Sequence, residues 1–181
     1  MSLPVATLIP GLILFALGAL LLIGGPSSGP LLKALPRSLA ATVILFGGAA
    51  CWFLSNVLDL TAADFGDYRK PLFVVFAGVA LLAFKFAPDF LAVRGLAALT
   101  LLGAWPLLMA GYLRYDPWTI YFYKVLVYLA VVFALWLGAA PFRLRDFLQW
   151  LFARPGRVRC AGGLAAGYGL LLVVVALTYS L

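Results

Sequence analysis

The side chains that could do chemistry in this sequence are few, and several of them fall close together. Asp59, Asp64 and Asp67 lie within nine residues, shortly after the polar pair Ser55 and Asn56. Carboxylate oxygens are suitable ligands for calcium, but the cluster lacks a glutamate and the spacing of a calcium-binding loop. Two basic residues also follow it at once. We therefore expect a solvated loop with internal ion pairs; a cation site, or a shallow polar site on the outer side, is the alternative.

The remaining inventory of reactive side chains is thin. The chain contains no histidine, and its six acidic residues are all aspartates. Histidine is the commonest general base and metal ligand, so haem, zinc and histidine-relay sites lose most of their support. No nucleophile is paired with a base, and no phosphate-binding or dinucleotide-binding fingerprint occurs. We predict no catalytic residue, no metal site and no cofactor, and hence a protein that is not an enzyme.

A second group of candidate residues is basic. The stretch RLRDFLQWLFARPGRVR, residues 143–159, holds five of the thirteen basic residues of the chain. One helical face would carry the apolar side chains of Leu144, Phe147, Leu148, Leu151 and Phe152. This spacing predicts an amphipathic helix at about residues 142–153, lying in the membrane surface with its basic residues on anionic headgroups. The expected contact residues are Arg143, Arg145, Arg154, Arg157 and Arg159.

Other partners for the basic run follow less directly from its pattern. Nucleic-acid binding would need the basic residues on an exposed aqueous face, whereas the apolar stripe of this helix is expected to be committed to lipid. An acidic protein that docks on Arg145 and Arg157 is the alternative that the same geometry allows. We therefore expect membrane lipids as partners, with a protein partner or a second copy as the alternative, and no nucleic acid.

These candidates must be positioned by a very apolar chain. Of its 181 residues, 66% are hydrophobic and only 10% are charged, and the mean hydropathy is +1.12. A soluble domain is about half apolar and about a quarter charged. Such a chain cannot bury its apolar surface in water, so we predict an all-α integral membrane protein.

Six segments approach the length of about 20 apolar residues that crosses a bilayer. They are residues 5–25, 38–58, 71–87, 91–113, 119–140 and 160–180. Continuous apolar runs favour helices over barrel strands. The first segment has no basic leader and is too long for a cleaved signal peptide, so we expect it to be retained. The sequence thus predicts one multi-pass domain over residues 1–181, a six-helix transmembrane bundle with the interfacial helix between spans five and six.

The basic residues also predict an orientation. Nine of the thirteen fall in the connections after the first, third and fifth spans, and four fall on the opposite side. Lysine and arginine accumulate on the cytoplasmic side of membrane proteins. This positive-inside pattern predicts that both termini lie outside the cytoplasm, in a bacterial inner membrane.

Aromatic residues cluster around the connection between the fourth and fifth spans. They are Tyr112, Tyr115, Trp118, Tyr121 and Tyr123. Tyrosine and tryptophan prefer the headgroup zone, so we interpret them as interfacial anchors on the outer side. An aromatic-lined ligand vestibule is the alternative.

Small residues indicate where helices could pack closely. Gly163-x-x-x-Gly167 in the sixth segment fits a small-xxx-small pattern, which indicates a packed bundle or an oligomer interface without choosing between them. Taken with the short connections and the absence of a mid-span charge, the pattern predicts a non-catalytic subunit or scaffold of a larger membrane assembly. The alternative is a small permease, or a substrate-binding membrane component, for an apolar or weakly polar solute.

Overall fold

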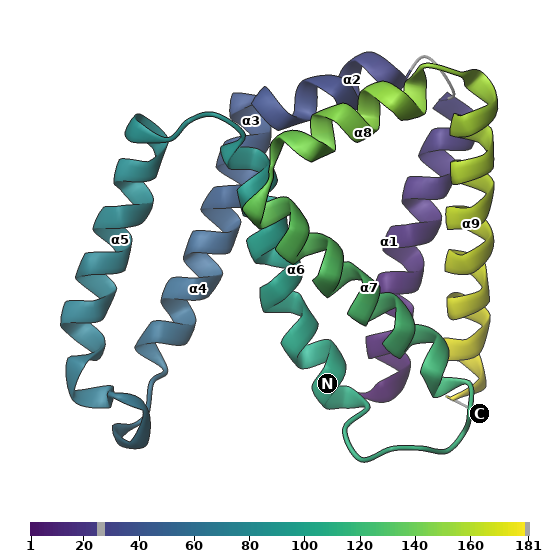
Figure 1. The fold of residues 1–181 in the computed structure, drawn as a ribbon. Coiled ribbons are helices and arrows are strands. Elements are labelled where there is room, and N and C mark those ends of the chain that lie inside the picture. The colour runs from purple at the N-terminus through teal and green to yellow at the C-terminus, as the bar shows by residue number, and fades with distance from the viewer. Residues whose placement is uncertain (25–27, 180–181) are drawn as a thin grey trace. The chain divides into compact units, whose positions relative to one another are not determined.

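The computed structural model describes residues 1–24 and 28–179, and all regular structure in this part of the chain is helical (Figure 1). The α-helices are α1 (Leu3–Gly24), α2 (Gly29–Ala34), α3 (Leu39–Thr42), α4 (Gly48–Leu58), α5 (Arg69–Phe86), α6 (Leu91–Ala110), α7 (Ile120–Ala139), α8 (Phe142–Phe152) and α9 (Pro155–Thr178). Shorter helical turns are η2 (Leu35–Arg37), η3 (Val43–Gly47), η4 (Ala62–Asp64) and η5 (Gly66–Tyr68). The predicted all-α class is confirmed.

Five helices of the described chain are long and apolar enough to cross a membrane. They are α1, the continuous run Leu39–Leu58, α6, α7 and α9. The predicted third span is not among them: it corresponds to α5, whose 18 residues include three charges, Arg69, Lys70 and Lys85. Six spans therefore stay a prediction. The predicted ends of the first and sixth spans, Gly25 and Ser180, lie outside the described residues.

The chain divides into two compact units, which are described separately. The first comprises Met1–Lys33, Gly103–Phe133 and Arg145–Leu181. The second comprises Ala34–Leu102 and Ala134–Leu144.

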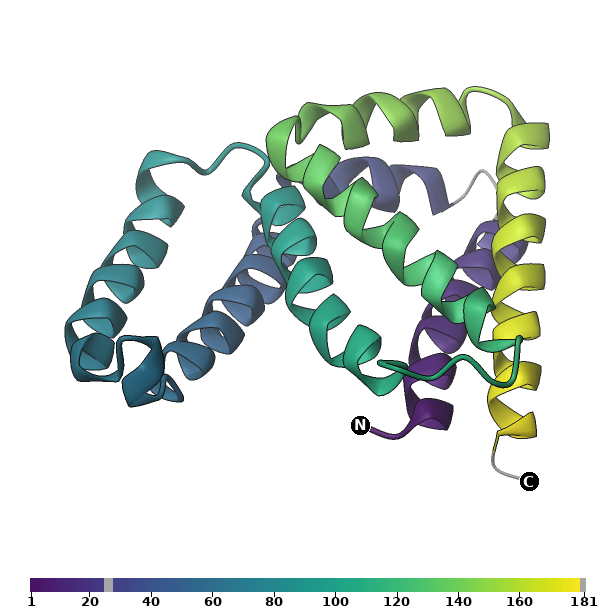
Figure 2. The same cartoon turned by 60° about the horizontal axis from the view of Figure 1, so that its bottom comes forward.

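The first unit is organised around an antiparallel pair formed by α1 and α9, which lie side by side in Figures 1 and 2. Glycines spaced seven residues apart meet at this contact: Gly11 and Gly18 on α1, and Gly162 and Gly169 on α9. A Cβ on Gly169 would lie 2.8 Å from the carbonyl oxygen of Gly11, and one on Gly162 would lie 3.1 Å from that of Gly18. The absence of these Cβ atoms lets the two backbones touch, as small residues do between membrane helices.

The small-residue motif singled out in the sequence does not make this contact. A Cβ added to Gly163 or Gly167 meets no other atom within 4 Å, apart from neighbouring chain and helix backbone. The neighbouring positions Gly162 and Gly169 face α1 instead, because a seven-residue spacing stays on one face of a helix.

We predict that Gly18→Ala destabilises the first unit, because the new methyl group would overlap the backbone of Ala166. The expected loss of unfolding free energy is ~1–3 kcal/mol, the usual cost of overpacking. Gly163→Ala is the matched control and should cause no loss. Thermal unfolding in detergent measures both, and equal melting temperatures for the two variants would contradict the contact.

The start of α7 packs into the core of the first unit. Tyr123 is completely buried, together with Ile120, Val127 and Leu172, and its hydroxyl has no hydrogen-bond partner in the described chain. This corrects the prediction that Tyr123 belongs to the exposed aromatic anchors. By contrast, the Tyr168 hydroxyl donates to the Phe122 carbonyl oxygen at 2.9 Å and thereby ties α9 to α7.

Two substitutions by phenylalanine distinguish the unpaired hydroxyl of Tyr123 from the hydrogen-bonded hydroxyl of Tyr168. Tyr123→Phe removes an unpaired buried hydroxyl and keeps the ring, so the unfolding free energy should stay the same or rise. Tyr168→Phe removes a made hydrogen bond between two helices and should lower it by about 1 kcal/mol. Chemical or thermal unfolding in one detergent compares the pair, and a larger loss for Tyr123→Phe would show that its hydroxyl does have a partner.

The second unit contains the continuous helical run Leu39–Leu58, which includes a π-helical turn at Val43–Gly47. Gly95 of α6 lies against this turn, and a Cβ there would overlap the backbone of Phe46. A π-turn carries one extra residue in its hydrogen-bonded loop, which widens the helix locally. The sequence predicted the helical run but not this turn, which lies where a second helix approaches closely.

Helices α4 and α5 of the second unit form an antiparallel hairpin (Figure 1). Two edge-to-face ring pairs join α5 to the run Leu39–Leu58: Phe46 of η3 with Phe84, at 5.4 Å between ring centroids, and Phe53 of α4 with Phe76, at 5.1 Å. No residue of α5 is buried within the structure. This helix therefore exposes apolar side chains along its whole length.

Candidate functional site

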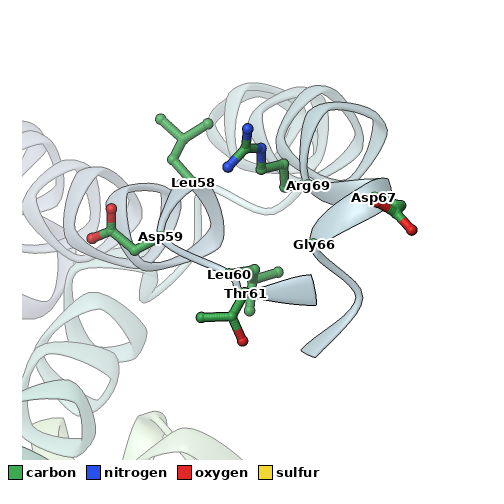
Figure 3. A pocket seen from close by; sticks show the side chains of 7 residues that line it. All are labelled: Leu58, Asp59, Leu60, Thr61, Gly66, Asp67 and Arg69. Carbon is green, nitrogen blue, oxygen red and sulfur yellow. The ribbon is translucent and has the colours of Figure 1, made fainter. Parts of the chain in front are cut away.

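The residues predicted to form an outer polar site gather at the connection between α4 and α5, but only two of them share a hollow. Its volume is about 550 Å³ and it opens at the end of the hairpin (Figure 3). Its lining residues are Leu58, Asp59, Leu60, Thr61, Gly66, Asp67 and Arg69. Ser55, Asn56 and Asp64 do not line it. The Ser55 hydroxyl instead donates to the Trp52 carbonyl oxygen of its own helix at 2.7 Å.

The shape of this connection follows from hydrogen bonds to one carbonyl group. The Thr61 carbonyl oxygen accepts from the backbone N–H groups of Asp64, at 2.9 Å, and Gly66, at 2.8 Å. Between these two residues Phe65 adopts a left-handed conformation with φ of 64°. A Cβ on Gly66 would lie 2.6 Å from the same carbonyl oxygen, so only glycine fits there without a shift.

The carboxylates of this hollow do not converge on one point. Figure 3 shows those of Asp59 and Asp67 at opposite ends, pointing away from each other. Within the described residues, no group of three or more acidic, histidine or cysteine side chains is placed to hold a metal ion. The expected internal ion pairs are also not recorded in residues 59–70; Asp64 instead accepts a hydrogen bond from the Thr61 hydroxyl at 3.1 Å. The arrangement is that of a small, exposed polar surface.

Two contributors to this hollow were missed from the sequence. Arg69, one of the two basic residues that follow the acidic cluster, lines the hollow beside Asp59 and Asp67. Gly66 was not singled out, although the tight turn depends on it. An Asp-rich stretch that contains an isolated glycine was the available signal for such a turn.

The basic run forms helix α8 and the start of α9, close to the predicted range. Leu144, Leu148 and Leu151 are buried, and Leu148 is only 9% exposed. The prediction that the whole apolar stripe faces lipid is therefore corrected, because its leucines already pack within the protein. The exposed apolar side chains of α8 are three aromatic ones, Phe142 at 44%, Phe147 at 42% and Trp150 at 53%, of which the last two are neighbours. The rings of these two stack at 6.1 Å between centroids.

The first two arginines of the run are engaged locally on α8. The guanidinium of Arg145 donates to one carboxylate oxygen of Asp146, at 2.9 Å and 2.8 Å. That of Arg143 lies 5.6 Å from the ring centroid of Trp136 and 5.7 Å from that of Phe142. Both side chains therefore have contacts within the chain.

Arg157 joins the start of α9 to the end of α8. Its guanidinium donates to the Trp150 carbonyl oxygen at 2.9 Å and lies 4.3 Å above the centre of the Trp150 ring. A guanidinium over an indole face is attracted to the ring's negative face. The two contacts fix the corner at which the chain turns from α8 into α9.

Arg154 and Arg159 differ from the other three arginines. Both are exposed, and within the described chain neither side chain has a recorded hydrogen bond or ion pair. Lys33 of α2 approaches the same corner, 5.6 Å from the ring centroid of Phe152. Phe152 also packs on Gly29, where an added Cβ would lie 3.1 Å from the ring. The contribution of α2 was not predicted, because it depends on contact between distant segments.

The aromatic connection between α6 and α7 is organised by one lysine. Lys124 donates to the Arg114 carbonyl oxygen at 3.0 Å, and its ammonium lies 5.8 Å and 5.7 Å from the ring centroids of Tyr115 and Tyr121. The lysine therefore extends to the helix end rather than into the span. Tyr115 and Trp118 are exposed.

No protein-family model matches this chain, and neither a curated protein nor a solved structure is significantly similar to it. The class of protein is therefore defined by its own structure. Its described residues form an all-helical chain in which five helices are long and apolar enough to cross a membrane.

We predict that Arg157→Ala lowers the unfolding free energy by ~1–2 kcal/mol, because it removes a charged hydrogen bond and a cation–π contact together. Arg159→Ala removes the same charge two residues away and should change stability much less. The melting temperatures of the two variants in detergent provide the measurement. A loss for Arg159→Ala as large as that for Arg157→Ala would mean that net charge, not the Trp150 contact, matters.

Proposed function

We propose that this protein is a non-catalytic, six-span subunit or scaffold of a larger membrane assembly. The observation that carries the proposal is α5, an apolar helix without a single buried residue. Its basic residues stand at its two ends, where long side chains can reach the headgroup level while their stems stay in the apolar layer. The uncharged stretch between Lys70 and Lys85 then lies across the hydrocarbon core.

Helix α5 has a surface that suits an apolar helix of a partner protein. Val74 and Leu81 are exposed at 68% and 73%, and a Cβ added to Gly78 meets no atom within 4 Å outside its own chain neighbours and helix backbone. Between membrane helices, association relies on close packing at small residues, since lipid is as apolar as leucine. A helix without a buried residue, with a glycine on an open face, supports a role in assembly.

The proposed placement follows the positive-inside rule. The connections that carry α2, the start of α6, α8 and the start of α9 hold nine of the thirteen basic residues, and we place them in the cytoplasm. Both termini then lie outside, and the host membrane is a bacterial inner membrane. The hollow between α4 and α5 opens on the outer side.

Extraction into native nanodiscs followed by mass spectrometry tests the assembly proposal. We expect a stoichiometric protein partner to accompany the wild-type chain and to be reduced several-fold by Gly78→Leu. Gly163→Leu is the matched control, because Gly163 also faces open space but lies on α9. A chain that is extracted alone with a reproducible small solute would overturn the proposal in favour of a permease.

The orientation has its own test. A reporter that is active only outside the cytoplasm, fused after Leu181, should be active. The same reporter placed in the connection between α8 and α9 should be silent. Activity of the second fusion and silence of the first would reverse the proposed topology.

A further inference from the structure

The corner between α8 and α9 carries an excess of positive charge. Residues 142–160 contain five arginines and one aspartate, and the carboxylate of Asp146 is already paired with Arg145. The charges of Arg154, Arg157 and Arg159 are therefore not balanced by an acidic side chain of the same segment. Lys33 adds a further charge through its contact with Phe152.

Exposed aromatic rings lie beside these charges. Trp150 is more than half exposed although Arg157 covers one face of its ring, and Phe147 stacks next to it. An aromatic body with a polar edge beside cations is the composition of a membrane-water boundary. In bulk water the same rings would expose an apolar surface to solvent, which is unfavourable.

Chain connectivity keeps this corner close to a bilayer surface. Helix α7 ends at Ala139 and α8 begins at Phe142, while α8 ends at Phe152 and α9 begins at Pro155. Both α7 and α9 are long and apolar enough to cross a membrane. Because only two residues connect α8 to the helix on either side, α8 must lie close to the membrane surface at which those two helices end.

We infer that this corner, defined as Lys33, Phe147, Trp150, Arg154, Arg157 and Arg159, binds the phosphate groups of anionic phospholipids. Arg154 and Arg159 serve as the phosphate ligands, because they are the arginines without a recorded partner in the described chain. Arg157 holds the Trp150 ring in place, and the rings of Trp150 and Phe147 lie in the layer between headgroups and acyl chains. The inference rests on the proposed cytoplasmic placement of α8 within a membrane subunit.

An acidic protein is a less suitable occupant. It would complement the charges but would leave the two aromatic rings without an apolar medium, whereas a phospholipid supplies both a phosphate and acyl chains. A basic side chain near an anionic surface gains roughly 1 kcal/mol, which corresponds to about a five-fold change in affinity for each charge.

The test uses the purified full-length protein in detergent, titrated with phosphatidylglycerol or phosphatidylcholine, with bound lipids counted by native mass spectrometry. We expect the wild-type protein to prefer phosphatidylglycerol. Arg154→Gln combined with Arg159→Gln should reduce its affinity for phosphatidylglycerol on the order of ten-fold and leave phosphatidylcholine unchanged. Arg69→Gln with Lys70→Gln, an equal loss of charge on α5, is the matched control and should retain the preference.

Three outcomes would overturn the inference. The first is that the wild-type protein binds both lipids equally well. The second is that the control variant loses as much affinity for phosphatidylglycerol as the Arg154→Gln, Arg159→Gln variant. The third is that Arg154→Lys combined with Arg159→Lys, which keeps both charges, binds phosphatidylglycerol as weakly as the glutamine variant. Because detergent titration needs neither a partner nor a given orientation, failure here leaves the assembly proposal standing. Failure of that proposal shows separately, as a missing partner in the nanodisc experiment.

Discussion

The structure depends on how two apolar helices adhere when their surroundings are equally apolar. Between membrane helices, burial of leucine against leucine gains little over burial against lipid, so close backbone approach must supply the attraction. The chain achieves this between its first and last helices, with Gly11 and Gly18 on α1 facing Gly162 and Gly169 on α9. These two helices are farthest apart in sequence, so their contact closes the first unit. Helix α7 then joins α9 in two ways. Tyr123 of α7 lies in one buried cluster with Leu172 of α9, and the Tyr168 hydroxyl of α9 donates to the Phe122 carbonyl oxygen.

A second constraint governs the charges, which must leave the apolar layer or find a partner within it. Arg145 is paired with Asp146, but three other basic residues contact aromatic rings and carbonyl groups near helix ends instead of acids. Arg157 uses the Trp150 ring and carbonyl, Lys124 the Arg114 carbonyl beside two tyrosine rings, and Lys33 the Phe152 ring. A chain with six acidic residues against thirteen basic ones cannot pair every cation with an acid, and aromatic rings are the available substitute.

Features that depend on a local sequence pattern could be predicted, whereas contacts between segments far apart in the sequence could not. Long apolar runs predicted six spans, five of which the structure shows as helices long and apolar enough to cross a membrane. The helical spacing of apolar residues in 143–159 predicted a helix, which the structure places at Phe142–Phe152. The π-turn beside Gly95, the contact of α2 with Phe152 and the burial of Tyr123 depend on segments far away in the sequence. The acidic cluster was misleading in part, because three aspartates within nine residues can still point apart when a turn separates them.

The basic run shows why counting charges does not define a binding surface. Five arginines looked equivalent in the sequence, but the structure assigns them different environments: one is paired with Asp146, one lies near aromatic rings of α7 and α8, and one holds a corner through Trp150. The leucines of α8 are likewise turned into the protein, and its exposed apolar side chains are those of Phe142, Phe147 and Trp150. Arg154 and Arg159 are exposed, whereas the other three arginines already have contacts within the chain. The proposed phosphate site is therefore assigned to these two residues rather than to the whole basic run.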